Sequence, residues 1–315
     1  MASLKDRIHT GLDETRMLVL GAQVLIGFQY RSVFEPGFKA FSQSSQYLAL
    51  SALGCLLVSV ALLMSPGAHH QLVEQTRNTE SLHRFTTVVT SLALFPFALG
   101  LAVIVFLVAE RVAGHAWGLA AGIATAGVAL FFWYGLELVR RLQFGPRPAD
   151  PVDKDPKGSD DADLTELIAQ VLVEVRVIIP GAQALLGFQL VIVLMDGFDS
   201  LPTSSKYAHL VSLLLMAVSV VFLMTPAAYH RIVEAGHESW KFYWFAHRML
   251  LAAMVPLPLG IAGDFFVVMR KITGSVLASV LGGILVLGVF YGFWFGLIVL
   301  RSRSNGREFT TPLAD

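Results

Sequence analysis

Four histidines stand beside long apolar stretches, and their side chains could bind a metal ion or a proton. His70 and His83 flank one polar loop, and His230 and His247 flank a similar loop in the second half of the chain. Imidazole ligates haem iron and divalent metals, and it exchanges a proton near neutral pH. The sequence has no C-x-x-C-H motif for haem attachment. We therefore expect no cofactor. Haem or a metal on these histidines is the alternative, next to a structural or proton-linked role.

Charged residues within or beside the apolar stretches form a second group of candidates. A charge in hydrocarbon costs several kilocalories per mole, so such residues mark either a pathway for ions or protons or a buried ion pair. The acids are Glu14, Glu137, Glu174 and Asp264, and the helix-end arginines are Arg16 and Arg84 in the first half and Arg176 and Arg248 in the second. Because opposite charges that border hydrocarbon should pair, we expect Glu14 or Glu137 to pair with Arg16 or Arg84. We expect Glu174 to pair with Arg176 or Arg248.

Two of these acids have no acidic counterpart in the other half of the chain. Glu137 stands three residues before Arg140, a spacing that favours a structural ion pair on a helix. Asp264 stands six residues before Arg270, roughly 9 Å into its apolar stretch at the helical rise per residue. For Asp264 the sequence leaves a structural and a functional role open.

Glutamines are the deep polar groups that occur in both halves, and two of them share a helical face with an arginine. Arg16, Gln23 and Gly27 fall within about 40° of one another on a helical wheel. Arg176 and Gln183 repeat the pattern with a glycine. Such a stripe lines a polar pathway or allows close helix packing, in which glycine permits contact and glutamine donates a hydrogen bond.

The composition predicts long helices that carry these residues. The chain has 315 residues, of which 55% are hydrophobic and 15% charged, and its mean hydropathy is +0.65. A helix needs about 20 mostly apolar residues to cross a bilayer, and continuously apolar runs favour helices over barrel strands. Eight stretches qualify: residues 16–35, 46–64, 85–109, 116–139, 175–195, 207–224, 248–269 and 275–300. We therefore predict an all-α polytopic membrane protein with eight transmembrane helices and the lipid bilayer as its surroundings.

Several function classes are disfavoured by the composition. The net charge is zero and the basic residues are scattered, which argues against nucleic acid as a partner. Cys55 is the single cysteine, so no intrachain disulfide is possible. No Ser-His-Asp order, paired-carboxylate motif or H-E-x-x-H signature supports an enzyme.

The distribution of basic residues predicts the orientation of the helices. Lysine and arginine near span ends are retained in the cytoplasm. A cytoplasmic N-terminus and C-terminus leave outside only Arg31, Lys39, Arg111, Lys206, Arg270 and Lys271. Residues 145–163 are rich in proline and aspartate, which is typical of a flexible linker. We expect a four-helix repeat in residues 1–144, a cytoplasmic linker in 145–163, a second repeat in 164–304 and a cytoplasmic tail in 305–315.

The two repeats come from an internal duplication. A shift of 160 residues aligns residues 12–70 with 172–230 without a gap, and 26 of these 59 positions are identical. The third helices each begin with a His-Arg pair, here at a shift of 164 residues. Because each repeat has four spans, an even number, both repeats enter the membrane in the same orientation.

The repeated motifs resemble a known family. The pattern E-x-R-x4-G-A-Q-x-L-x-G-F-Q begins at Glu14 and again at Glu174, and P-x-A-x-H follows in each half. It is similar to a family of short bacterial four-helix membrane proteins of unknown function, and the chain looks like two fused copies. Automatic annotation sometimes labels this family as a sodium/proton antiporter. The resemblance thus implies a bacterial inner membrane and a small cation or proton as the substrate.

Three functions remain open on the sequence alone. The first is transport of a small cation or proton near the repeat interface. The second is a non-catalytic accessory or scaffold module in which the repeated motifs only hold the helices together. The third is an electron carrier that holds haem on one histidine pair.

Overall fold

The first half of the chain forms a series of helices in this computed structural model, which describes residues 4–72, 80–144, 159–234 and 239–292. They are α1 (Leu4–Ser32), the 3-10 helix η1 (Pro36–Ala40), α2 (Gln43–Leu72), α3 (Glu80–Ala113), α4 (His115–Leu130), the π-helical turn η2 (Phe131–Gly135) and α5 (Leu136–Phe144). No strand occurs in the described residues of either half. The predicted all-α fold class is therefore confirmed.

The second half repeats this order. Its helices are α6 (Ser159–Ile192), α7 (Asp196–Asp199), α8 (Thr203–Ile232), α9 (Trp240–Ala253), α10 (Pro256–Thr273) and α11 (Val276–Tyr291). Helix α6 thus begins inside the segment 145–163 that we expected to be a linker. Three aspartates follow its first residue, and negative charges near a helix N-terminus are stabilised by the helix dipole.

Six helical segments are long and apolar enough to cross a membrane. They are Gln43–Gly67, Ser81–Ala113, His115–Gln143, Leu167–Ile192, Thr203–Ile232 and Trp240–Thr273. Each coincides with one of the predicted spans. The chain is therefore a multi-pass membrane protein by the length and composition of its helices.

The first and last of the eight predicted spans are not among these six. Helix α1 is long, but Arg16, Arg31 and two glutamines make it less apolar. Helix α11 is strongly apolar and has 16 described residues, which is short for a span. Its predicted continuation to residue 300 lies outside the described residues.

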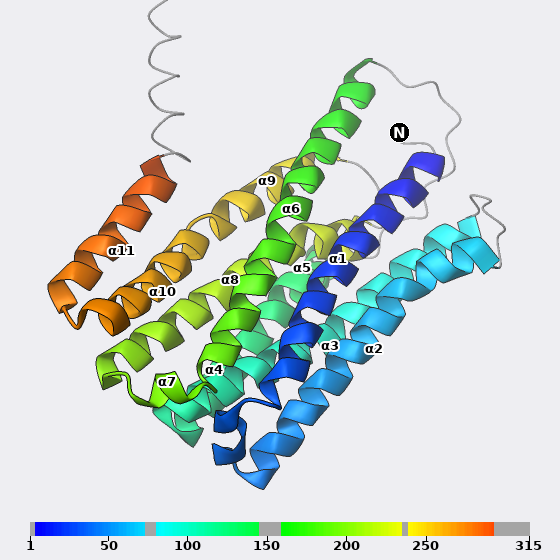
Figure 1. The fold of residues 1–315 in the computed structure, drawn as a ribbon. Coiled ribbons are helices and arrows are strands. Elements are labelled where there is room, and N and C mark those ends of the chain that lie inside the picture. Colours follow the sequence, from blue (N-terminus) through cyan, green and yellow to red (C-terminus); the bar gives the residue numbers. More distant parts are fainter. Residues whose placement is uncertain (1–3, 73–79, 145–158, 235–238, 293–315) are drawn as a thin grey trace, which may run out of the picture.

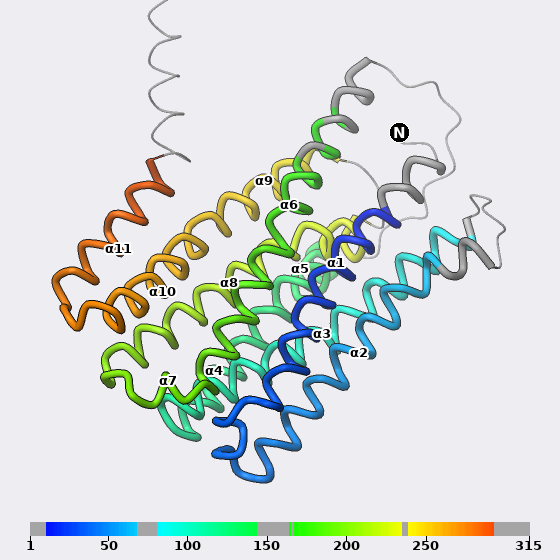
Figure 2. Tube along the Cα trace, viewed as in Figure 1, coloured from blue at the N-terminus to red at the C-terminus, as the bar shows by residue number. Residues whose placement is uncertain are grey.

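The helices run side by side in one bundle, with α2 near one edge and α11 at the opposite edge (Figure 1). Helix α1 of the first half packs on α6 of the second, and α3 packs on α8. Figure 2 shows that η1, α7, the α3–α4 corner and the α10–α11 corner all lie at the same end of the bundle. We call it the η1–α7 end, and it is the end expected to face outward.

Apolar side chains from both halves form one core. Phe97 of α3, Leu186 of α6 and Leu213 of α8 belong to it and are fully buried. Trp133 of η2 is also buried, and its indole Nε1 donates a hydrogen bond to the carbonyl oxygen of Val221 in α8, at 3.3 Å. The two repeats therefore share a single interior.

Prolines show how the third helices of the two halves differ. Pro96 lies inside the continuous helix α3, whereas Pro256 begins α10 after α9 has ended at Ala253. Proline cannot donate a backbone hydrogen bond and is favoured in the first turn of a helix. The second half is four residues shorter between its His-Arg pair and this proline, and there its helix is broken.

A backbone contact at the η1–α7 end joins the two halves. The amide of Gly37 donates a hydrogen bond to the carbonyl oxygen of Leu194, at 2.8 Å. A Cβ atom on Gly37 would lie 2.5 Å from that oxygen, whereas a Cβ atom on the equivalent Gly197 would meet nothing within 4 Å. Only one of the two equivalent glycines is thus needed for packing.

We predict that Gly37→Ala lowers the free energy of unfolding by about 1–3 kcal/mol, because the methyl group overpacks against backbone that cannot move aside cheaply. Gly197→Ala is the matched control and should leave stability unchanged. Thermal unfolding of the two variants in the same detergent measures the difference. Equal stabilities would show that the packing of η1 against the segment after α6 does not depend on this contact.

Candidate functional site

A buried ionic cluster joins the two repeats at the end of the bundle opposite η1 and α7. The Oε1 atom of Glu14 in α1 lies 2.6 Å from Nδ1 of His230 in α8. The other carboxylate oxygen accepts a hydrogen bond from Nε of Arg231, at 2.7 Å. All three side chains are at least 97% buried. We call these residues the inner cluster.

Small and aromatic residues shape the space for this cluster. Gly11 lies one turn before Glu14 on α1, and a Cβ atom there would be 2.5 Å from a guanidinium nitrogen of Arg231. The ring of His230 stacks on Phe242 of α9, with 4.6 Å between the ring centroids. The Thr15 hydroxyl donates to the Gly11 carbonyl oxygen. A glycine and a stacked ring thus let an imidazole and a guanidinium group reach one carboxylate.

The cluster holds Glu14 in its charged form. Glu14 precedes the first predicted span, and its burial acts to raise the pKa of its carboxyl group. The charges of His230 and Arg231 and their hydrogen bonds outweigh burial and lower that pKa below its ordinary value. The second ring nitrogen of His230, Nε2, is buried and has no hydrogen-bond partner in the described part of the chain. His230 therefore has one occupied and one open ring nitrogen.

Most ion pairs that we expected from the sequence are not formed. Glu14 pairs across the repeats, whereas Arg16 and Arg176 both pair with Asp13, at 3.0 and 3.4 Å. Arg84, Glu174 and Arg248 are exposed. Residues two apart on a helix point in different directions, so Glu14 enters the bundle while Arg16 points out of it. The prediction for Glu14 and Arg176 was therefore wrong in its partners.

The prediction for Glu137 is confirmed. Its carboxylate accepts two hydrogen bonds from Arg140, at 2.7 and 2.8 Å, and one from Arg141. The Glu137 side chain is 7% exposed, and both arginines follow it on the same helix. This is a structural ion pair at the end of a candidate span.

Asp264 belongs to a second polar cluster, toward the η1–α7 end, which we call the outer cluster. Its Oδ2 atom accepts a hydrogen bond from the Gln189 amide at 2.5 Å, and its Oδ1 atom lies 3.2 Å from Nδ1 of His209. The other ring nitrogen of His209 lies 3.0 Å from the backbone carbonyl oxygen of Gln189. Three helices of the second repeat, α6, α8 and α10, thus meet through one carboxylate and one imidazole.

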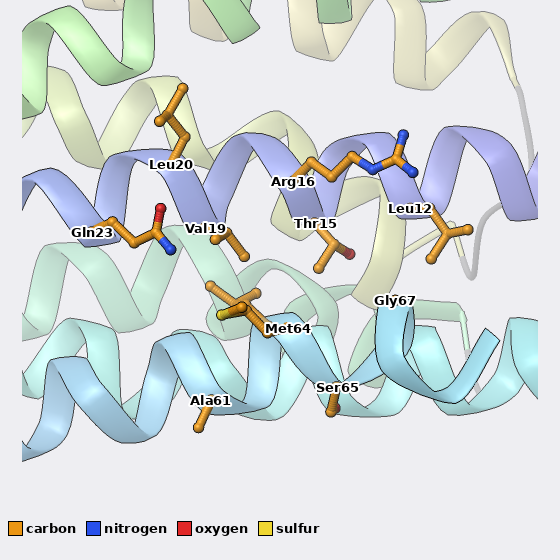
Figure 3. Close-up of a pocket in the computed structure, with 11 residues that line it drawn as sticks. Leu12, Thr15, Arg16, Val19, Leu20, Gln23, Ala61, Met64, Ser65 and Gly67 are labelled. Carbon is orange, nitrogen blue, oxygen red and sulfur yellow. The ribbon is translucent and has the colours of Figure 1, made fainter. Parts of the chain in front are cut away.

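The two glutamines of the predicted stripe have different environments. Gln183 is fully buried, its amide nitrogen lies 3.6 Å from the Met224 sulfur, and its side chain packs against Gly21 of α1. Gln23 is exposed. It faces a pocket between α1 and α2 together with Arg16 (Figure 3). The stripe therefore serves helix packing in the second repeat only.

The remaining candidate histidines that the structure describes have different surroundings. His83 is buried in α3, while His247 is half-buried in α9 and its ring contacts Tyr243 and Trp244. The side chain of His70 lies outside the residues whose burial is described. Among the described residues no three His, Cys, Asp or Glu side chains form a metal-binding group. Haem binding stays a prediction, which a Soret absorption band of the purified protein would test.

Sequence reasoning missed Arg231 and His209 as members of buried clusters. Both positions break the repeat, because the equivalent residues are Gln71 and Ala49. Asp264 breaks it as well, opposite Ile104. Polar residues that differ between the two duplicated halves were therefore the signal for both clusters.

Comparison with known proteins agrees with the duplication. The profile of a family described only as a family of unknown function, DUF6328, matches residues 5–137 and again residues 160–298. No curated protein and no solved structure matches the chain significantly. The predicted resemblance to two fused copies of one family is confirmed.

We predict that Glu14→Gln lowers the free energy of unfolding by about 3–5 kcal/mol, because it leaves the buried guanidinium of Arg231 and the ring of His230 without their carboxylate. Glu174→Gln changes the repeat-equivalent, exposed residue and should have little effect. Adding Arg231→Gln, the residue of the first repeat, should recover part of the loss. Chemical unfolding in detergent measures these differences, and equal losses for Glu14→Gln and Glu174→Gln would refute the assignment of the inner cluster.

Proposed function

From the premise that this chain belongs to the DUF6328 family and carries two of its units in tandem, we propose that it moves protons across a membrane, alone or in exchange for a small cation. Its two carboxylate–histidine clusters would bind the proton near the two faces. This function is compatible with a multi-pass protein. It assigns a chemical role to polar groups that are costly to bury.

The observation that carries this proposal is the position of two buried histidines on one helix. His209 and His230 both lie on α8, twenty-one residues apart, and each approaches a carboxylate from another helix. At the helical rise they are roughly 31 Å apart, about the thickness of the hydrocarbon core of a bilayer. Asp, Glu and His side chains within the membrane form the proton relays of pumps and transporters.

The surroundings of His209 suit a group that gains and loses a proton. Its two ring nitrogens face two acceptors, the Asp264 carboxylate and the Gln189 carbonyl oxygen. Only the doubly protonated ring carries a proton on both nitrogens and a charge that attracts the carboxylate. Loss of one proton would therefore weaken the attraction of α8 to α6 or α10.

Polar side chains also occur between the two histidines. Gln183 of α6 and Ser219 and Thr225 of α8 are fully buried in this stretch. The Oε1 atom of Gln183 has no hydrogen-bond partner among the described residues. These groups support a route for protons along the α6–α8 contact, which lies between the two clusters.

We also propose that the chain has eight spans and that both termini lie in the cytoplasm of a bacterial cell. Helix α1 would add a span through its contact with α6, and α11 would add the last. Three of the basic residues assigned to the outside, Arg111, Lys206 and Lys271, have partners within α7 or next to it. Their location at one end of the bundle agrees with their assignment to one side of the membrane.

The second candidate is a structural accessory module, and the inner cluster favours it. Arg231 stabilises the charged form of Glu14, which makes this carboxylate a poor proton carrier. If the outer cluster likewise only holds helices together, its substitution would lower stability and change no flux. A flux measurement combined with unfolding therefore separates the two functions.

We predict that proteoliposomes containing the purified chain dissipate an imposed pH gradient, and that His209→Gln and Asp264→Asn lower this rate by roughly tenfold or more, as expected when a proton-transfer group is removed. His115→Gln is the matched control. His115 lies at the same end of the first repeat, 2.7 Å from Glu110, and is exposed. A pH-sensitive dye inside the vesicles reports the flux.

Each outcome separates the two functions. Wild-type flux in folded His209→Gln and Asp264→Asn would remove the outer cluster from the pathway. Absence of flux from the folded wild-type chain, under sodium, potassium and pH gradients, would reject transport and leave the accessory module. Unfolding curves of every variant establish that the protein in the vesicles is folded.

A further inference from the structure

A pocket of about 720 Å³ lies between α1 and α2 of the first repeat. Its walls are mostly apolar, from Leu12, Val19 and Leu20 of α1 and Ala61, Leu63 and Met64 of α2. Figure 3 shows Val19 and Met64 pointing toward each other across it, while Arg16 runs along α1 toward the N-terminal end. We propose that this α1–α2 pocket binds one anionic phospholipid of the surrounding bilayer, with its phosphate at Arg16 and an acyl chain along the apolar wall.

The pocket opens toward the lipid-facing side of α2. Leu20 and Met64 line it and are 52% and 54% exposed, and the neighbouring Val58 is 53% exposed. Helix α2 carries one of the six candidate spans, so these side chains would face hydrocarbon. An acyl chain is therefore the occupant that reaches the pocket without passing through water.

The second repeat closes the equivalent space with its own side chains. Met224 and Gln183 are buried, whereas their counterparts Met64 and Gln23 are exposed. The cause is the α1–α6 contact, where Gln183 packs on Gly21 but the equivalent Gly181 has no neighbour within 4 Å of a Cβ atom. The pocket is therefore a feature of the first repeat and not of the fold that both repeats share.

The charge at the mouth of the pocket selects an anion. Arg16 and Arg176 share a single carboxylate, that of Asp13, at 3.0 and 3.4 Å. Glu174 lies two residues before Arg176 on α6, and residues at this spacing point in different directions. Among the side chains that the structure describes, Arg16 and Arg176 thus carry one positive charge in excess of Asp13, and this charge attracts the phosphate of an anionic lipid.

Gln23 supplies a second polar contact deeper in the pocket. It is seven residues from Arg16, or roughly 10 Å along the helix. Gln23 makes no hydrogen bond within the described part of the chain, and an amide that faces hydrocarbon gains from finding an acceptor. A diacyl phospholipid offers a phosphate, then ester carbonyl oxygens, then hydrocarbon. The pocket offers Arg16 for the phosphate, Gln23 for an ester carbonyl oxygen and apolar walls for the hydrocarbon.

The test is native mass spectrometry of the full chain titrated with phosphatidylglycerol or with phosphatidylcholine of the same chain length. We expect one phosphatidylglycerol to bind in preference. Arg16→Gln should weaken it by about fivefold, the effect of removing roughly 1 kcal/mol from one basic residue near an anionic headgroup. Ala61→Phe should weaken both lipids by roughly tenfold or more, because the ring occupies the pocket.

Val58→Phe is the matched control for Ala61→Phe, because Val58 is exposed on the same helix but does not line the pocket. Equal affinity of the wild-type chain for the two lipids would overturn the charge assignment, and with it the proposal. Unchanged binding in Ala61→Phe would overturn the location. If Ala61→Phe fails to fold, the phosphatidylglycerol affinity of Arg16→Gln tests the proposal alone. The exposed side chain of Arg16 does not support the core, so this variant should fold. The result does not depend on whether the protein moves protons.

Discussion

The carboxylate of Glu14 is the constraint on which the arrangement of the two repeats depends. It is fully buried and contacts His230 and Arg231, both of which come from the other repeat. A buried charge without a partner costs several kilocalories per mole, so α1 and α8 must meet at this point. Helices that associate in lipid gain little from apolar burial alone, because lipid tails are equally apolar. The ionic contact therefore determines which surfaces of the two repeats meet.

This constraint also explains why the duplicated halves are not equivalent. The second repeat has Arg231 where the first has Gln71, so a second cluster around Glu174 would lack its arginine. Glu174 is accordingly exposed, and the contact between α1 and α6 is one-sided. Gln183 enters the space above Gly21, whereas Gln23 remains outside and borders the α1–α2 pocket. The two repeats thus differ at Gln71 and Arg231, and identical residues such as Gln23 and Gln183 have different surroundings in them.

Much of the fold could be predicted from the sequence, because apolar length and repetition determine it locally. The positions of six candidate spans, the two copies and the Glu137 ion pair follow from hydropathy, self-alignment and helical spacing. The partners of Glu14 and Asp264 could not be predicted in the same way, because they come from helices far away in the sequence. Equivalent residues were expected to have equivalent partners, and the break in the repeat at Arg231 shows why that expectation failed. His209 and Asp264 have no counterpart at all, so their contact depends on how three helices pack.

The two clusters differ in the partners of their carboxylates and in how far these carboxylates are exposed. At the inner cluster an arginine keeps the carboxylate charged, and α9 covers the histidine with the ring of Phe242. At the outer cluster no arginine contacts Asp264 among the described residues, and its side chain is 25% exposed. The helix break before Pro256 separates α9, which packs at the inner end, from α10, which carries Asp264. The contact that ties α10 to α6 and α8 is therefore separate from the Glu14 contact that holds the repeats together.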